Sequence, residues 1–188
     1  MGGRVKKQLS EMTLEELWKL FPIILTPHDP AWASFYEEER LRLAGLLPKM
    51  TRESHVGSTA IPAIWAKPII DILIEADDPA ALKGPARAAG YVLMSESPDR
   101  LSFNRGYTPD GFAQRVYHLH VRRPGDNDEL YFRDYLNDHP DAAKQYEALK
   151  LSLWKPYEHD RDGYTREKTA LVAEYTALAR AAYPGRYD

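Results

Sequence analysis

The order of the expected elements in this 188-residue chain predicts an α+β fold, a mixed β-sheet packed with several helices. Helices and strands are mixed in the first part of the chain. Short runs separated by Pro, Asp and Gly turns then predict antiparallel strands, and the end of the chain has helical periodicity. The length suits one domain, and the chain contains no repeat, linker or low-complexity segment. We therefore expect residues 1–188 to form a single domain, with 1–12 loosely attached.

The first elements follow from capping signals. Thr13 and Glu16 have the spacing of a capping box, which predicts a short helix to about residue 20. Residues 21–26 are expected to form a first strand. Asp29 and Pro30 supply an N-cap and a proline for the first helical position, so we expect a helix over 29–47. Its apolar stripe comprises Trp32, Tyr36, Leu43 and Leu47.

The sheet is expected to form from the middle of the chain. Residues 55–58 end a short strand, and the branched apolar run at 69–74 predicts a buried strand. A helix over 79–89 should close at Gly90, the usual residue type beyond a helix C-terminus. The remaining expected elements are strands at 91–95, 101–107 and 115–121, and helices at 128–136, 140–157 and 165–183.

Composition narrows the class of protein. Hydrophobic residues make up 44% and charged residues 28%, as in globular proteins generally. A net charge of −3 creates no general attraction for nucleic acid. The absence of cysteine excludes disulfides and thiolate metal sites. No apolar run could span a membrane and no signal peptide is evident, so we expect a cytoplasmic protein with no membrane partner. The composition selects no oligomeric state.

The most informative stretch surrounds Asp71. A Gly57-Ser58 turn precedes this aspartate by 13 residues, and Asp71 itself lies within the predicted buried strand at 69–74. An ionised carboxylate in such a strand is costly unless a positive group faces it. We therefore expect a bound cation or a basic side chain beside Asp71.

This arrangement resembles the GrpB family, whose fold is similar to that of the DNA polymerase beta-type nucleotidyltransferases. The resemblance covers most of the chain in order, through segments 29–32, 55–71, 118–120, 132–136 and 164–168. It implies a metal-dependent nucleotidyltransferase that moves a nucleotidyl group from a nucleoside triphosphate to a small acceptor. In that superfamily a Gly-Ser turn holds triphosphate oxygens through backbone N–H groups and the hydroxyl. The resemblance thus implies nucleotide contacts at Gly57, Ser58 and Thr59, and catalytic roles for Ser58 and Asp71.

One position departs from the superfamily pattern. Two-metal phosphoryl transfer uses a second carboxylate two residues beyond the first, since alternate residues of a strand share a face. Leu73 occupies that position here. Glu75 is on the same face, but its Cα is roughly 13 Å further along the strand, too far to complete one metal shell with Asp71. The site would then hold one metal, recruit a ligand from elsewhere, or be catalytically silent.

Two histidines are candidates for the missing ligands. His118 and His120 share one face of a later strand, and two imidazoles so spaced can bind one transition metal. With Asp71 they would form a set of two histidines and one carboxylate for a divalent ion such as Mg²⁺, Mn²⁺ or Zn²⁺. The alternative is that one histidine only hydrogen-bonds a neighbouring carboxylate while the other faces the opposite side of the sheet.

Basic residues are expected near the acidic centre. The cations that we place there are Lys67, Arg105, Arg115 and Lys168, of which Lys67, Arg105 and Lys168 are candidate nucleotide contacts. We place Lys168 in the first turn of the last helix. His55 is either a phosphate ligand or a core histidine, and the core role is favoured.

Other sites receive less support. The chain contains no Gly-x-Ser-x-Gly, Walker A or Rossmann motif. The cluster from Gly125 to Asp128 is calcium-like, but the rest of an EF-hand loop is missing, so Asp126 or Asp128 is expected to cap the next helix. Two hypotheses remain: a nucleotidyltransferase, or a non-catalytic nucleotide-binding, ligand-binding or accessory module that retains the fold. Phosphoester hydrolysis at a His/Asp metal site ranks below both.

Overall fold

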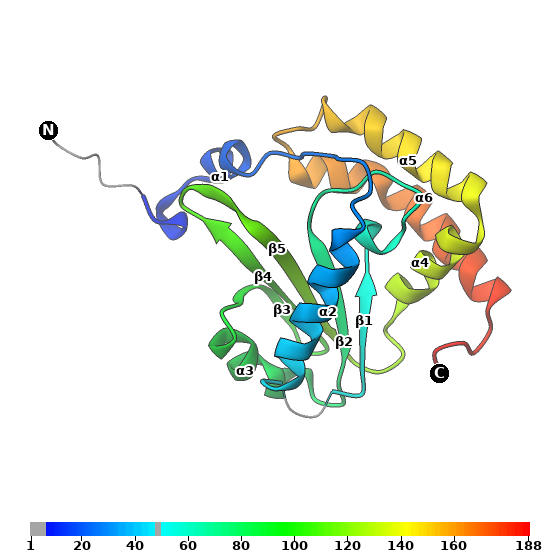
Figure 1. The fold of residues 1–188 in the computed structure, drawn as a ribbon, viewed down its shortest axis with the longest axis horizontal. Coiled ribbons are helices and arrows are strands. Elements are labelled where there is room, and N and C mark those ends of the chain that lie inside the picture. The colour runs from blue at the N-terminus through cyan, green and yellow to red at the C-terminus, as the bar shows by residue number, and fades with distance from the viewer. Residues whose placement is uncertain (1–6, 48–49) are drawn as a thin grey trace, which may run out of the picture.

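The computed structural model describes residues 7–47 and 50–188 and contains a five-stranded sheet in the order β1-β2-β5-β4-β3 (Figure 1). Strands β2 and β5 are parallel, and the other neighbours are antiparallel. The sheet is therefore mixed, and the predicted α+β class is confirmed. The strands are β1 (Arg52–Val56), β2 (Ile70–Glu75), β3 (Val92–Ser97), β4 (Arg100–Thr108) and β5 (Gly111–Arg122).

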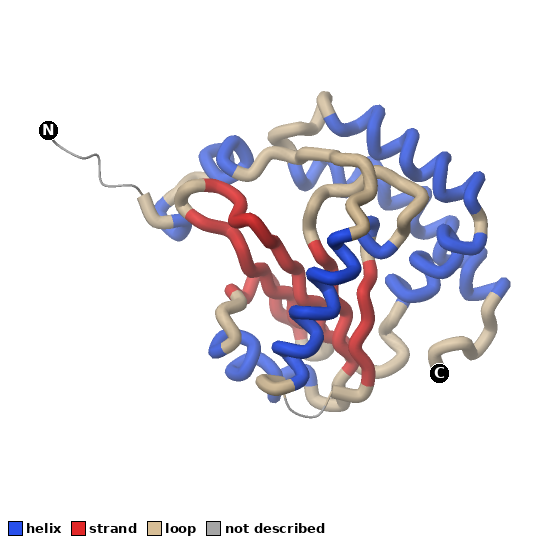
Figure 2. The backbone as a smooth tube through the Cα atoms, in the orientation of Figure 1, coloured by secondary structure: helices blue, strands red, loops and turns tan. Residues whose placement is uncertain are grey.

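The helices form two groups around this sheet. Helix α2 crosses one face, whereas α4, α5 and α6 gather beside the end of the sheet that carries β1 (Figures 1 and 2). The α-helices are α1 (Leu14–Leu20), α2 (Ala31–Ala44), α3 (Lys83–Ala88), α4 (Asp128–Asp138), α5 (Pro140–Trp154) and α6 (Arg161–Ala182). Three 3-10 helices, η1 (Leu9–Glu11), η2 (Ser58–Ala60) and η3 (Pro79–Leu82), complete the fold. None of the helices in the described part of the chain is long and apolar enough to cross a membrane.

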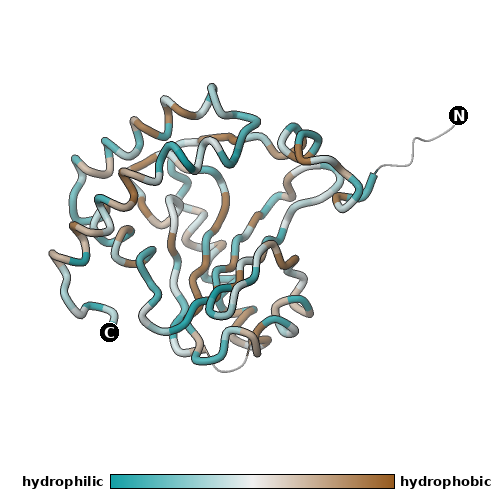
Figure 3. The backbone as a smooth tube through the Cα atoms, turned by 180° about the vertical axis from the view of Figure 1, so that it is seen from behind, coloured by the Kyte–Doolittle hydropathy of each residue, from teal (hydrophilic) through white to brown (hydrophobic). Residues whose placement is uncertain are grey.

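Alternation along β2 separates the core from the candidate site. Ile70, Ile72 and Ile74 are buried in one cluster with Trp32 and Tyr36 of α2. Burying each isoleucine contributes about 1.5–3 kcal/mol. The view from behind shows hydrophobic residues in the central strands (Figure 3). The intervening residues of β2 face the opposite side of the sheet, where polar chemistry can be placed.

The predicted strand at 21–26 is wrong. Only Thr26 forms a bridge, with Ala66, and the segment has no continuous partner strand. Its alternating apolar side chains are buried instead against the C-terminal helices: Ile23 packs against Tyr164, and the indole N–H of Trp154 donates to the Ile23 carbonyl at 2.6 Å. The alternation of apolar and polar residues thus reflects an extended, half-buried segment that does not pair continuously with a neighbouring strand.

Helix boundaries also differ in part from the expectation. The capping box forms as predicted, with Glu16 N–H donating to Thr13 Oγ1 and Thr13 N–H donating to Glu16. Helix α6, however, begins at Arg161 rather than 165, because the Asp160 side chain accepts a hydrogen bond from Gly163 N–H. Lys168 is therefore not in the first turn, as predicted, but one turn further into the helix.

Candidate functional site

The centre of the site is built by a glycine turn and two parallel strands. Gly57 follows β1 with φ of 71°, a conformation that favours glycine. A Cβ at Gly57 would lie 2.4 Å from Asp71 Oδ2, so only glycine lets this carboxylate approach the turn. The parallel register of β2 and β5 places Asp71 opposite His118 and Leu73 opposite His120. The turn and the two strands therefore converge on one carboxylate.

Asp71 accepts hydrogen bonds from both histidines. His118 Nδ1 lies 3.2 Å and His120 Nε2 3.0 Å from Asp71 Oδ1. Burial alone would raise the pKa of Asp71, but the hydrogen bonds from His118 and His120 outweigh it and hold the pKa well below its usual range. Asp71 is therefore ionised at neutral pH, and the expectation that both histidines face one side is met.

His118 connects this carboxylate to a tyrosine. The Tyr107 hydroxyl lies 2.8 Å from His118 Nε2, and Arg161 Nη2 donates to the same hydroxyl at 3.0 Å. Burial lowers the pKa of His118, although Asp71 opposes the shift. With a neutral imidazole, Nδ1–H donates to Asp71 and Nε2 accepts from Tyr107, a tautomer assigned from the network. The chain Arg161–Tyr107–His118–Asp71 thus orients the carboxylate.

The donor set fits one divalent transition metal. One ligand atom each from Asp71, His118 and His120 lie within 4.8 Å of one another. Donors at about 2.0–2.2 Å from one ion are separated by distances close to these. Imidazole nitrogen suits Mn²⁺ or Zn²⁺ better than Mg²⁺, which prefers oxygen ligands. Of the three ions expected from the sequence, the donor set thus favours Mn²⁺ and Zn²⁺.

A polar cavity of about 170 Å³ adjoins this centre. Lysine side chains from three segments enter it: Lys67 before β2, Lys150 on α5 and Lys168 on α6. Lys150 Nζ donates to Ser58 Oγ at 3.2 Å and to the Trp65 carbonyl. The other lining residues are Leu25, Gly57, Ser58, Ile69, Asp71, His118, Tyr146 and Tyr164.

Aromatic rings hold the lysines in place. Lys168 Nζ is 4.2 Å and Lys67 Nζ 5.7 Å from the centre of the Tyr164 ring, and Lys150 Nζ is 5.0 Å from that of Tyr146. Tyr164 is buried, and its hydroxyl has no hydrogen-bond partner among the described residues. A polar ligand in the cavity would supply one.

The three lysines have pKa values below their ordinary range. Burial lowers the pKa of Lys67 and Lys150 to about 7 and that of Lys168 to about 8, and the lysines also repel one another. Asp71 opposes the shift at Lys67 and Lys168. A bound anion would reverse these shifts, so the cavity is suited to a polyanionic group.

Two predicted cations lie elsewhere. Arg105 is opposite Tyr117 in the β4–β5 ladder, one residue out of phase with His118, and its Nη2 is 3.0 Å from Glu39 on α2. Arg115 forms an ion pair with Glu38 of α2. Both guanidinium groups thus face α2 instead of the acidic centre, and their predicted location near Asp71 is wrong. Strand parity along β5 would have excluded Arg115, which is three residues from His118. Arg105 could be excluded only from its register with β5, because Tyr107, two residues further along β4, contacts His118 after a register shift.

Thr59 and His55 serve the core. The Thr59 side chain is buried, and its hydroxyl donates to the Ile69 carbonyl at 3.1 Å. His55 Nε2 lies 2.9 Å from the same hydroxyl, and its ring stacks on Tyr36. Burial lowers the pKa of His55 to about 4, so the ring is neutral. The Thr59 hydroxyl is therefore occupied within the protein, and His55 has the favoured core role.

The position of the missing carboxylate is apolar and closed. Leu73 is buried with Val56 and Leu130. Glu75, at the far end of β2, accepts from Arg52 Nη1 at 2.8 Å and from the Gly125 backbone N–H at 2.8 Å. Neither residue reaches Asp71, which is the single carboxylate of the metal-ligand group found among the described residues.

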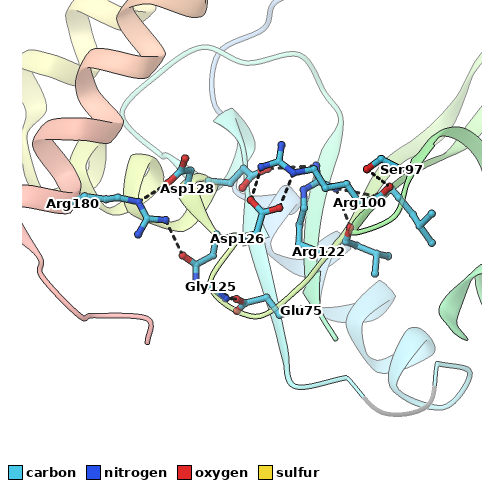
Figure 4. Close-up of polar contacts among 12 residues, drawn as sticks. Glu75, Ser97, Arg100, Arg122, Gly125, Asp126, Asp128 and Arg180 are labelled. Carbon is cyan, nitrogen blue, oxygen red and sulfur yellow. Dashed lines mark hydrogen bonds and ion pairs between the residues drawn. The ribbon is translucent and has the colours of Figure 1, made fainter. Parts of the chain in front are cut away.

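The acidic cluster that follows β5 is neutralised by arginines (Figure 4). Asp126 binds Arg100 through two hydrogen bonds, of 2.6 and 2.7 Å, and Asp128 binds Arg180 at 2.6 Å. Neither carboxylate caps α4, whose N-cap is Asn127, so that expectation is wrong. The cluster joins the sheet to α6 and leaves no carboxylate free for calcium.

Sequence reasoning missed several residues of the site. Lys150, Tyr107, Arg161, Tyr146 and Tyr164 all contact or line it. A signal for one of them exists: Tyr146 and Lys150 are four residues apart, and both are on the buried stripe of α5. A lysine in that position needs a polar partner, and Ser58 supplies it.

The chain is similar to known proteins in both sequence and fold. The chain matches the sequence profile of the GrpB protein family over residues 22–178. A UPF0157 protein of Pseudomonas aeruginosa is 42% identical, over 85% of this chain and 69% of that protein. The crystal structure of the conserved protein GrpB from Enterococcus faecalis superposes with a TM-score of 0.73 at 29% identity, covering 85% of this chain and 99% of that one.

A cytoplasmic RNA terminal U-transferase is a much more distant neighbour. Its TM-score is 0.47 at 12% identity, over 73% of this chain and 43% of that one, which decides nothing about chemistry. The family profile and the relative at 42% identity are sufficient to assign the family. The chain belongs to the GrpB protein family.

Proposed function

We propose that this protein is a metal-dependent nucleotidyltransferase that moves a nucleotidyl group from a nucleoside triphosphate to a small acceptor. One observation carries the proposal: a cavity lined by three lysines, one buried and two partly buried, and by the Gly57-Ser58 turn directly adjoins the Asp71, His118 and His120 cluster. A triphosphate carries the negative charge that would pair with the lysine ammonium groups. The adjoining cluster has the ligand atoms that a metal ion requires.

The residues divide the work between them. Lys67, Lys150 and Lys168 bind the β- and γ-phosphates, and Ser58 Oγ, already held by Lys150, donates to a phosphate oxygen. Asp71, His118 and His120 would hold the metal, which when bound neutralises charge on the reacting phosphate. Tyr107 and Arg161 keep the His118 ring oriented.

The reaction balances without any further reagent. An acceptor hydroxyl oxygen forms a bond to the α-phosphorus while the bond from that phosphorus to the bridging oxygen breaks. Pyrophosphate leaves with the electron pair into the lysine cavity, and the hydroxyl proton passes to solvent. Catalysis of this kind depends mainly on positioning and charge stabilisation.

A non-catalytic nucleotide-binding or accessory module is the second candidate, and Leu73 favours it. The second carboxylate of a two-metal site is replaced by a buried leucine in an apolar cluster. Such a module would bind nucleotide or another ligand without turning it over, or would bind no nucleotide, so binding and turnover separate the two candidates.

The test is a thermal-shift panel of nucleotides, each with Mg²⁺, Mn²⁺ or Zn²⁺, followed by an assay for pyrophosphate release. A nucleoside triphosphate with Mn²⁺ or Zn²⁺ should raise the melting temperature, since ligand at 100 times its Kd adds about 2.7 kcal/mol. Pyrophosphate release supports the transferase, and binding without release supports the module. Absence of any shift with every pair contradicts the transferase and favours the accessory module.

A further inference from the structure

A second, apolar groove lies beside the polar centre, between α1 and the β3–β4 hairpin. Its volume is about 480 Å³, larger than that of the lysine cavity. The apolar side chains that line it include Leu14, Leu17, Trp18, Phe21, Val92 and Met94. A concave surface of this kind suits an organic ligand.

The walls of this groove are unusually exposed for their residue types. Leu14 is 57%, Val92 63% and Met94 59% exposed. Val92 and Met94 belong to β3, the edge strand of the sheet, and Leu14 belongs to the helix facing them. Large apolar side chains grouped around one hollow mark a binding surface better than the same residues scattered singly.

The groove adjoins the metal-ligand cluster through Tyr107. Tyr107 lines the groove and contacts His118, which lines the lysine cavity. Strand register gives the same result, because Val92, Asn104, His118 and Asp71 are paired in turn across β3, β4, β5 and β2. Residues directly paired share a face, so this row runs over three strand spacings, roughly 14 Å. The groove and Asp71 therefore lie on the same face of the sheet, with Tyr107 and His118 between them.

The charged side chains that line the groove determine which charge its ligand can carry. Among the described residues, Arg161 contributes a positive side chain to the wall, and no Asp or Glu lines it. Arg105 also lines the groove, but its guanidinium pairs with Glu39 on the α2 side. A cation would find no carboxylate there to pair with, whereas a neutral or anionic ring system would meet the rings of Trp18, Phe21 and Tyr107 and the guanidinium of Arg161.

The geometry of phosphoryl transfer then selects which substrate the groove takes. The attacking and leaving oxygens lie roughly in line across the phosphorus. The lysine cavity, which takes the leaving pyrophosphate, is lined by residues of α5, α6 and the turn after β1, whereas the groove is lined by residues of α1, β3 and β4. The Asp71–His118 row is between them, so an acceptor attacking in line arrives from the groove.

We infer that this groove binds the acceptor, and that the acceptor is a small molecule with an apolar, ring-bearing portion and no positive charge. The inference rests on the proposed function for the identity of the ligand as acceptor. The nucleotide then occupies only the lysine side, and groove and cavity can be filled together.

The test uses the anionic two-ring fluorophore 8-anilinonaphthalene-1-sulfonate with the full chain. Saturable binding at one site is expected. Leu14→Asp and Met94→Asp, from opposite walls, should each weaken binding about tenfold or more, since each places a charge against the rings. Leu41→Asp is the matched control: Leu41 is 65% exposed on α2, outside the groove, and binding should be unchanged. ATP with Mn²⁺ should not displace the fluorophore.

The outcomes separate the two proposals. If both groove variants bind the fluorophore as tightly as the wild-type protein, or if Leu41→Asp loses as much affinity as they do, the groove is not the binding site. Displacement by ATP with Mn²⁺ would show that the groove takes the nucleotide and would overturn the assignment to the acceptor. Failure of the wild-type protein to bind any nucleotide would sink the transferase, whatever the fluorophore does. An unchanged thermal shift by ATP in Met94→Asp, beside lost fluorophore binding, supports both.

Discussion

The two ends of strand β2 carry carboxylates on the same face in opposite circumstances. Glu75 is 2% exposed, and it accepts from Arg52, the Gly125 N–H and Asn127. Asp71, whose side chain is 25% exposed, accepts only from two imidazoles, both at Oδ1. Oδ2 of Asp71 has no hydrogen-bond partner among the described residues.

The difference shows what separates a structural carboxylate from a functional one. Glu75 is paired with an arginine and fully hydrogen-bonded, so it joins β1, β2 and the loop after β5 (Figure 4). Asp71 keeps free binding capacity next to a cavity lined by lysines that do not form ion pairs with it. The first arrangement favours rigidity, and the second leaves room for a metal and an anion.

Removing the charge at each end of β2 should produce the largest difference between the two carboxylates. Asp71→Asn should reduce Mn²⁺ affinity by more than the roughly 10- to 100-fold that outer-shell changes cost, because it removes the anionic ligand. Glu75→Gln should leave Mn²⁺ affinity unchanged and lower the free energy of unfolding by about 3 kcal/mol, because Arg52 loses its buried partner. Calorimetric titration and urea denaturation measure the two effects. Equal behaviour of the two variants would end the distinction.

A methyl group at Gly57 should damage only the Asp71 end. Gly57→Ala forces a Cβ against Asp71 Oδ2 at a positive φ, which should destabilise the protein by about 1–3 kcal/mol and weaken Mn²⁺ binding. Gly84 is the matched control, because it lies in helix α3 and a Cβ there meets nothing within 4 Å. Gly84→Ala should be neutral or stabilise by about 0.4–1 kcal/mol. A neutral Gly57→Ala would mean that the turn does not constrain the carboxylate.

Removing one lysine tests the cavity side of the same end. Lys150→Met should raise the Kd for ATP about tenfold, or roughly 1.4 kcal/mol, because it removes a charge and the contact to Ser58. The control is Lys155→Met, on an exposed lysine that pairs with Glu158 near the same helix end. ATP titration by calorimetry at fixed Mn²⁺ compares them. Equal ATP affinities in the two variants would mean that Lys150 does not contribute to ATP binding.

A further prediction concerns the pH dependence of stability, which should be confined to the ligand-free protein. Burial lowers the pKa of Lys150 to about 7 and that of Lys168 to about 8, against roughly 10.4 in the unfolded chain. Between these values the unfolded state binds more protons, so the free energy of unfolding should rise with pH from about 7 toward 10. Saturating triphosphate should flatten the rise by keeping the lysines charged. Urea denaturation at several pH values shows whether the slopes differ; identical slopes would contradict anion binding by these lysines.

Local patterns predicted much of this structure. The branched run around Asp71 defined β2 and its two faces, and the His118/His120 spacing placed both rings on one side. Strand parity is a property of neighbours in sequence, so it transfers to the fold unchanged.

Long-range packing explains what local patterns missed. Residues 21–26 alternate like a strand, but whether a ladder forms depends on a partner, and the C-terminal helices cover the segment instead. Lys150 reaches Ser58 across 92 residues of sequence, a contact that depends on how α5 docks. Arg105 looked like a site cation until its register with Tyr117 placed it on the α2 side.

One measurement tests the central claim most directly: calorimetric titration of Mn²⁺ into the wild-type protein, with and without a non-hydrolysable ATP analogue. We expect one Mn²⁺ site, bound more tightly when the analogue is present, since the two ligands share one centre and their coupling is reciprocal. Asp71→Asn should abolish the site in both titrations. Absence of Mn²⁺ binding by the wild-type protein in both titrations, or Mn²⁺ binding that survives Asp71→Asn, would contradict it.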